Sequence, residues 1–289
     1  MSATIASLRR KIESAGNLQS VVGAMKALAA SSIGQYEQSV KALSDYYRTV
    51  ELGLGVCFRQ SLPLEAPRPA EKGVIGAIVF GSDQGLVGRF NDVAVSHAVE
   101  VLGKLSSKPR VRAVGERVHA RLADAGIEPA GLFPVPNSVQ GIAPLVGNIL
   151  LDCQEERGGI SELHLIHNRP TTGAVYEPVH QRLLPMDEAW RSELVALAWP
   201  SKNLPQVIGG DISTLRALIG EYLFVSLFKA CAESLASENA SRLAAMQRAD
   251  RNIDELLEDL NRNFRRLRQS GIDEELFDLI AGFEALKDR

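Results

Sequence analysis

The chain has few cysteines and no apolar segment that could cross a membrane. Cys57, Cys153 and Cys231 are widely spaced and form no Cys-x-x-Cys pair, which argues against a disulfide framework or a zinc site and favours a reducing compartment. The longest uncharged run, 129–151, is interrupted by prolines and could not satisfy its own backbone in lipid. We therefore expect a soluble protein with three buried, unpaired cysteines.

Charge and catalytic motifs are equally sparse. A net charge of -3 and a pI near 6.0 give no support to nucleic-acid binding. No Walker-type G-K-[ST] sequence occurs, and the five histidines form no recognisable ligand set. His164 and His167 lie an odd step apart on an expected strand, so they should point to opposite faces. We expect no catalytic residue, no bound cofactor and no metal site.

What the chain does contain is two very long helical patterns, one at each end. Apolar or small side chains recur at steps of three and four, which is the seam of a coiled coil. No proline follows Pro205. The N-terminal seam runs through Ile5, Leu8, Ile12, Ala15, Leu18, Val22, Met25, Ala29, Ile33, Tyr36, Val40, Leu43, Tyr47, Val50 and Leu54. The C-terminal seam continues to Leu276, Leu279, Phe283 and Leu286.

Connectivity predicts how these helices pair. The first helix enters the middle of the chain and the second leaves it, so paired seams must be antiparallel. In the simplest register, position i faces about position 268 minus i. To within a turn either way, Met25 then lies near Arg242 and Leu243, and Arg9 and Arg10 fall near Glu258 and Asp259. The last residues of the second helix project past Met1 as a single helix.

The middle of the chain predicts an α/β domain. An apolar strand at 73–80 is followed by a glycine-rich loop and a helix at 92–105. Further strands are expected at 111–114, 132–135, 163–166 and 175–184, the last antiparallel at an edge, with helices at 117–125 and 144–154. This alternation indicates a Rossmann-like open sheet with helices on both faces.

The fold class is therefore α+β/α/β, a long antiparallel coiled coil of N- and C-terminal helices flanking a Rossmann-like α/β domain. The predicted boundaries are 1–57 for the N-terminal helix, 73–200 for the α/β base and 211–289 for the C-terminal helix.

The loop at 81–91 is the only segment that invites an enzymatic interpretation. A glycine-rich turn after a first strand can hold phosphate at a helix N-terminus. However, Gly81, Gly85 and Gly88 do not have the G-x-G-x-x-G spacing, and Asp83 would repel an anion. Tight-turn packing explains the loop equally well.

Three segments together resemble a known family: SLRRKIESAGNLQSVVGAMKALAASSI near the start, GSDQGLVGRFN after the first strand, and SLASENASRLAAMQRADRNIDELLEDLNRNFRRLRQSGIDEEL toward the end. They are similar to the γ subunit of F-type ATP synthases, and the similarity covers essentially the whole chain. The resemblance implies a rotor shaft that couples ion translocation through a membrane ring of c subunits to ATP synthesis or hydrolysis on a hexamer of α and β subunits, with ε beside the base.

The resemblance also implies where partners touch the chain. Met25, Lys26 and Arg242 match positions beside the lever region of the β subunit, and Arg268 with Gln269 matches a position that contacts a β loop. Leu276, Leu279 and Phe283 would lie in the upper bearing. Catalysis would belong to β. The implied location is peripheral, on the cytoplasmic face of a bacterial inner membrane, where the chain is membrane-associated without spanning it.

Some residues depart from the family pattern. Gln84, Val87 and Arg89 replace the expected Arg, Cys and Gly of the loop, and Asp273 replaces a common Thr. These differences suit a divergent bacterial enzyme, including the alternative forms encoded beside a standard one.

Two other functions stay open at this point. A Rossmann-like nucleotide-binding enzyme with a coiled-coil dimerisation arm would bind ATP or NAD through 81–88 and self-associate along its helices. A static scaffold would need no moving partner, and only a rotation or coupling assay separates it from a rotor.

Overall fold

The computed structural model describes residues 4–60, 73–156, 159–171, 175–207 and 211–287, with only the backbone described at 211 and 281–287. The chain divides into two compact units. We call them the hairpin unit (residues 1–29 and 243–289) and the sheet unit (residues 30–242). Two long helices, α1 (Ile5–Gln60) and α6 (Asp211–Lys287), each contribute to both units.

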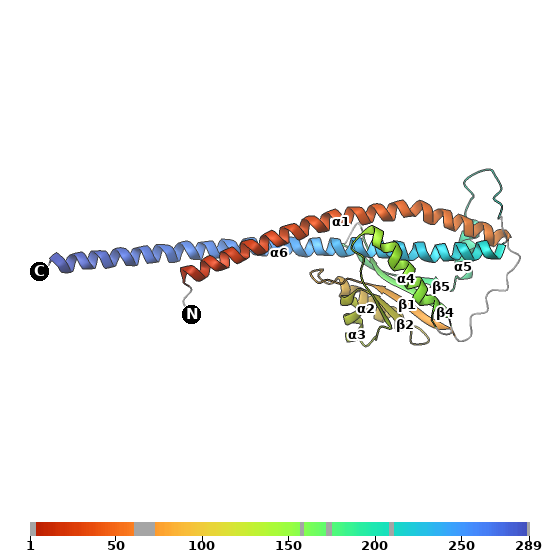
Figure 1. Ribbon diagram of the computed structural model, residues 1–289, viewed down its shortest axis with the longest axis horizontal. Helices are drawn as coiled ribbons and strands as arrows, with labels where there is room; N and C mark the ends of the chain where they lie inside the picture. Colours follow the sequence, from red (N-terminus) through yellow and green to blue (C-terminus); the bar gives the residue numbers. More distant parts are fainter. Residues whose placement is uncertain (1–3, 61–72, 157–158, 172–174, 208–210, 288–289) are drawn as a thin grey trace. The chain divides into compact units, whose positions relative to one another are not determined.

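The hairpin unit is an antiparallel pair made by the start of α1 and the end of α6. Val22, Met246 and Ile253 form its buried cluster, and four further side chains pack against them: Met25, Ala245, Ala249 and Leu257. Within this unit α6 continues past the start of α1 as a single helix (Figure 1). The antiparallel pairing and the projecting end are confirmed.

The predicted register holds in the sheet unit. Position 46 was expected opposite position 222, and the Tyr46 hydroxyl donates to the neighbouring Glu221 at 2.8 Å.

In the hairpin unit the register is displaced from the prediction. Position 26 was expected opposite Arg242, but the Lys26 ammonium lies 2.5 Å from the Asp250 carboxylate. The side-chain amide of Gln19 donates to Asp254 rather than lying near position 249. In the hairpin unit the two helices are therefore displaced by roughly one and a half to two turns relative to the expected alignment. One predicted seam residue, Leu18, is 53% exposed.

The sheet unit contains five strands in the order β3-β2-β1-β4-β5. All neighbours are parallel except β4 and β5, which are antiparallel. The edge position and direction of the last strand are thus confirmed. The strands are β1 (Val74–Phe80), β2 (Arg110–Val114), β3 (Gly131–Phe133), β4 (Ile160–Arg169) and β5 (Glu177–Leu184).

Helices cover both faces of the sheet, as predicted for a Rossmann-like fold. Side chains alternate along β1, so Ile78 and Phe80 join one core and Ala77 and Val79 the other. The first core includes side chains of α1, α4 and α6, and the second those of α2 and α3 (Figure 1). The shorter helices are α2 (Phe90–Leu102), α3 (Glu116–Asp124), the 3-10 turn η1 (Val139–Gly141), α4 (Ile142–Gln154) and α5 (Glu188–Ala196).

Helix α5 was not predicted from the sequence. It begins at a clear cap, because the Asp187 carboxylate accepts the Trp190 N–H at 2.8 Å. Trp190 then packs edge-on against Phe58 of α1 and against Tyr222 of α6. A short helix of this kind is stabilised mainly by those tertiary contacts, which a local pattern does not reveal.

The two histidines of β4 point to opposite faces, as expected. His164 Nδ1 lies 2.8 Å from His180 Nε2 on β5, whereas His167 Nε2 lies 2.7 Å from a Glu233 carboxylate oxygen on α6. Within the described residues, no group of three or more His, Cys, Asp or Glu side chains is arranged to hold a metal ion.

The His164–His180 pair makes stability depend on pH. Burial lowers the pKa of His164; Glu162, whose carboxylate is 3.1 Å from Nε2, opposes this shift, and Arg182 adds to it. A depressed histidine pKa favours folding above the unfolded value of about 6.5, and this advantage is lost as the pH falls.

We expect the free energy of unfolding to fall between pH 7.5 and 5.5, with His164 contributing at most about 1.4 kcal/mol per pH unit. Urea titrations at both pH values, with His164→Gln beside the native chain, check this. The variant should show a shallower pH dependence; equal slopes would contradict the assignment to His164.

The three cysteines, Cys57, Cys153 and Cys231, are buried, as expected. Burial raises the pKa of Cys153, and the nearby Arg112 opposes that shift. In the part of the chain that the structure describes, no helix combines the length and apolar character needed for a membrane span.

Candidate functional site

The predicted contact residues near the start of α1 are already engaged inside the hairpin unit. Met25 packs, half-buried, against the cluster of Val22, Met246 and Ile253. The side chains of Lys26 and Asp250 retain 31% and 24% of their exposure. Lys26 therefore forms an ion pair within the chain, which the resemblance alone did not indicate.

The distal part of α6 carries exposed arginines around much of the helix, while Phe264 and Leu267 are half-buried. Arg262, Arg265, Arg266 and Arg268 are exposed although they wind around the helix. Arg262 and Arg266 make local contacts with Asp259 and Asn263, one turn earlier, both at 3.2 Å. Gln269 is exposed beside Arg268. The exposed part of this surface is open to partners.

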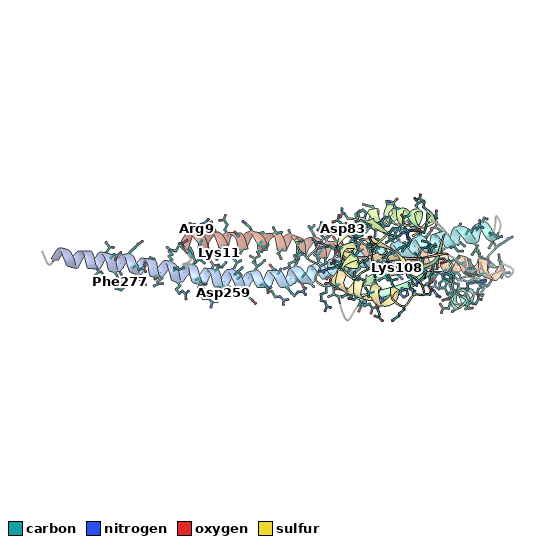
Figure 2. The ribbon with its side chains drawn as sticks, turned by 90° about the horizontal axis from the view of Figure 1, so that it is seen from below. Arg9, Lys11, Asp83, Lys108, Asp259 and Phe277 are labelled. Carbon is teal, nitrogen blue, oxygen red and sulfur yellow. The ribbon has the colours of Figure 1, made fainter. Side chains whose placement is uncertain are left out.

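Beyond the arginines, α6 carries exposed apolar side chains. Figure 2 shows Phe277 on this projecting part of the helix, far from the labelled Asp259. The exposed fractions are 55% for Ile272, 53% for Leu276, 69% for Phe277, 71% for Leu279 and 47% for Ile280. The side chain of Phe283, also predicted to contact a partner, lies outside the described residues, as does that of Leu286. So large an apolar surface on one helix is typical of a protein interface.

In the sheet unit, Arg242 is largely buried and paired. Its guanidinium donates to Glu238 at 2.6 Å and to the side-chain oxygen of Asn239 at 3.4 Å. Only 13% of the Arg242 side chain and 7% of the Glu238 side chain remain exposed. Burial raises the pKa of Glu238, while the neighbouring Arg242 charge opposes the shift and Asp83 adds to it.

The same stretch of α6 is anchored to the loops at the carboxyl end of the sheet. The Ser241 hydroxyl donates to the Val87 carbonyl, and the Ser237 hydroxyl donates to the Asn168 carbonyl at 3.1 Å. Together with the His167–Glu233 contact, these bonds join α6 to β4 and to the loop after β1. Glu233, Ser237 and Ser241 recur at steps of four, which places them on one face of a helix. We did not predict their contacts with the sheet from that pattern.

The glycine-rich loop at 81–91 uses its polar groups internally. The Gly81 N–H donates to Val114, and the Ser82 N–H donates to the Asn91 side chain at 3.0 Å. The Asp83 carboxylate accepts from the N–H of Glu116, at the start of α3, and from that of Val135. Figure 2 labels Asp83 in this region. The Asp83 carboxylate therefore caps α3 and not α2, the helix that follows the loop, and a phosphate bound in this loop would meet that negative charge.

Two comparisons of sequence place the chain among known proteins. A family model described as ATP synthase matches residues 4–286. The ATP synthase gamma chain of Roseiflexus castenholzii is 30% identical, with 97% of this chain and 98% of that one covered. The ATP synthase gamma chain of a Parafrankia species is 28% identical over 99% of both chains.

Solved structures show the same fold. A chain from the Euglena gracilis mitochondrial ATP synthase rotor aligns with a TM-score of 0.60 at 17% identity, covering 93% of this chain and 98% of that one. A second Euglena structure, of the OSCP/F1/c-ring assembly, aligns with a TM-score of 0.62 at 16% identity, covering 98% of this chain and 94% of that one. Since the family model extends over nearly the whole sequence, the chain belongs to the family of ATP synthase gamma chains.

Proposed function

We propose that this chain is the central rotor shaft of an F-type ATP synthase and couples ion translocation through a membrane ring to ATP synthesis or hydrolysis. The observation that carries the proposal is the match along nearly the whole chain to ATP synthase gamma chains, including both long helices. The helix pair is asymmetric, because α6 continues beyond the N-terminal end of α1 as a single helix (Figure 1). An asymmetric shaft presents different surfaces to surrounding subunits as it turns.

The partners follow from this role. The paired helices stand inside a hexamer of α and β subunits, and the sheet unit contacts ε and the c-ring. ATP chemistry takes place on β, so this chain contributes no catalytic residue. The assembly is peripheral, on the cytoplasmic face of a bacterial inner membrane. The departures at Gln84, Val87, Arg89 and Asp273 are compatible with an alternative form of the enzyme.

The partner contacts divide into two groups. The exposed Arg268, Gln269, Leu276 and Leu279 are available to β or to the bearing, and Phe283 belongs with them by position. Met25, Lys26 and Arg242 are partly or largely buried in contacts within the chain. We therefore propose that these three act on β chiefly by shaping the shaft, while the exposed group makes the larger contact area.

Reconstitution tests the proposed function. The purified chain, mixed with α and β subunits, should assemble a complex with sustained ATPase activity and ATP-driven rotation. Failure to assemble would defeat the proposal. Assembly and ATPase activity without rotation would favour the static scaffold. Calorimetry with ATP and NAD addresses the enzymatic alternative, because binding of either through 81–88 would favour it.

Arg268 and Gln269 provide the sharpest test of the exposed group. Replacing both by Ala should weaken coupling roughly fivefold, because truncating an interface arginine commonly removes about 1 kcal/mol or more. Nucleotide affinity of isolated β should not change. The readout is ATP-driven ion pumping relative to ATPase rate in the full complex. Glu255→Ala, at another exposed position of α6, is the control. Unaltered coupling in the double variant would show that Arg268 and Gln269 do not belong to the contact surface.

A further inference from the structure

The hairpin unit has an apolar seam that is poorly suited to setting its own alignment. Its cluster consists of Val22, Met246 and Ile253, with two alanines, Met25 and Leu257 packed against it. Methionine adapts to irregular spaces, and alanine offers little shape for interlocking. The alignment expected from connectivity, in which position i faces about position 268 minus i, also satisfies the apolar pattern: Val22 would face Met246 and Ala15 would face Ile253.

Charge distinguishes the two alignments. In the register expected from connectivity Lys26 would face position 242, which is an arginine, whereas in the structure its ammonium lies 2.5 Å from Asp250. Gln19 would face Ala249, whereas in the structure it donates to Asp254 at 2.5 Å. Both polar contacts cross between the helices and lie beside the apolar cluster. Each is lost if either helix slides.

The ion pair is partly buried, which strengthens the attraction between its two charges. Lys26 and Asp250 keep less than a third of their side-chain exposure. Solvent therefore screens them less than a fully exposed pair. A polar residue within an apolar helix seam is the best-attested device for specifying register, even where it adds little stability.

We propose that Lys26–Asp250, supported by Gln19–Asp254, is the register lock of the paired helices. These are positioning residues: they hold the two helices in the one alignment that places the exposed surface of α6 correctly along the shaft. The expected effect of this lock on coupling rests on the proposed function. The register itself is a property of the isolated chain.

Charge reversal and charge exchange test the lock. Lys26→Asp should place two carboxylates together and shift the balance between the registers by roughly five- to thirtyfold, the factor given by one or two kcal/mol. Asp250→Lys should do the same with two ammonium groups. The exchange K26D/D250K should restore the native alignment. Lys11→Asp makes the same charge change at an exposed position of the same helix and should have no effect.

Register is measured on the full-length isolated chain with spin labels at Ser14→Cys and Ser270→Cys, both exposed positions of the hairpin unit. The native cysteines are buried and should not compete for label. Sliding toward the register expected from connectivity should lengthen the label distance by on the order of 10 Å. Where Lys26→Asp prevents pairing, as circular dichroism would reveal, Lys26→Gln should broaden the distance distribution instead.

The outcomes separate the proposals. Longer or broader distances in both single variants, with recovery in the exchange, support the lock. Unchanged distances in K26D and D250K, or no recovery in the exchange, overturn it. Coupling in the assembled complex should follow the distances. If coupling stays low in the exchange although the distance has recovered, Lys26 contacts β directly and the proposed effect of the lock on coupling is wrong. Failure to assemble in the native chain would instead count against the proposed function.

Discussion

Replacing Arg242 by Ala should destabilise the sheet unit by about 3–5 kcal/mol at neutral pH. The reason is that the Glu238 carboxylate, with 7% of its side chain exposed, would remain buried without its cation. Denaturant unfolding followed by circular dichroism measures the loss. Both residues lie on α6 one turn apart, so the effect should not require any partner subunit.

The double variant R242A/E238Q separates the lost charge pair from the lost side chain. A neutral amide in place of the carboxylate should recover most of the stability. The pH dependence provides a second check. A raised Glu238 pKa favours the folded state at low pH, and this advantage is lost as the pH rises through the folded value. The defect of R242A should therefore shrink toward pH 5.

Two results would contradict this account. One is an R242A chain as stable as the native chain, and the other is a loss that E238Q does not relieve. The double variant also addresses the role of Arg242 in the shaft. Coupling that returns together with stability means that Arg242 acts through Glu238. Coupling that stays low in a stable double variant means that Arg242 touches a partner directly.

Replacing Gly115 by Ala should cost about 3–5 kcal/mol of unfolding free energy and disorganise the loop after β1. Gly115 has a φ of +119° at the end of β2. A Cβ there would lie 2.8 Å from the backbone carbonyl of Ser82. Backbone strain and overpacking each contribute roughly 1–3 kcal/mol. The Ser82 carbonyl cannot retreat freely, because it accepts the Arg117 N–H.

Gly126→Ala is the matched control. Gly126 also has a positive φ, +81°, but nothing lies within 4 Å of the position of an added Cβ. It should lose only the about 1–2 kcal/mol of left-handed backbone strain. The difference between the two variants in urea midpoint measures the contact with Ser82. Equal losses would mean that the close approach of the loop to Gly115 is not what requires glycine there.

Local patterns were sufficient for most of the fold because they report what each segment buries. The alternation of strands and helices from 73 to 184 led to the observed parallel sheet with an antiparallel edge strand. The short helix α5 was missed because it depends on Trp190 packing against distant Phe58 and Tyr222. Sequence neighbours carry no information about such contacts.

The candidate contact residues divide in the same way. That Arg268 and Gln269 are exposed follows from a helix with charge on every side, and the structure places them so. That Arg242 is buried beside Glu238 could not be read from spacing, because a pair four residues apart on a helix is usually exposed.

The amino-acid sequence by itself determined the two long helices, their antiparallel direction and the α/β character of the middle, because periodicity and connectivity are local or topological properties. Only the tertiary structure decided the alignment of the helices in the hairpin unit. The apolar seam accepts more than one register, and the choice rests on which charged side chains meet. Lys26 pairs with Asp250 in the folded chain, and the repeat of hydrophobic residues does not predict that ion pair.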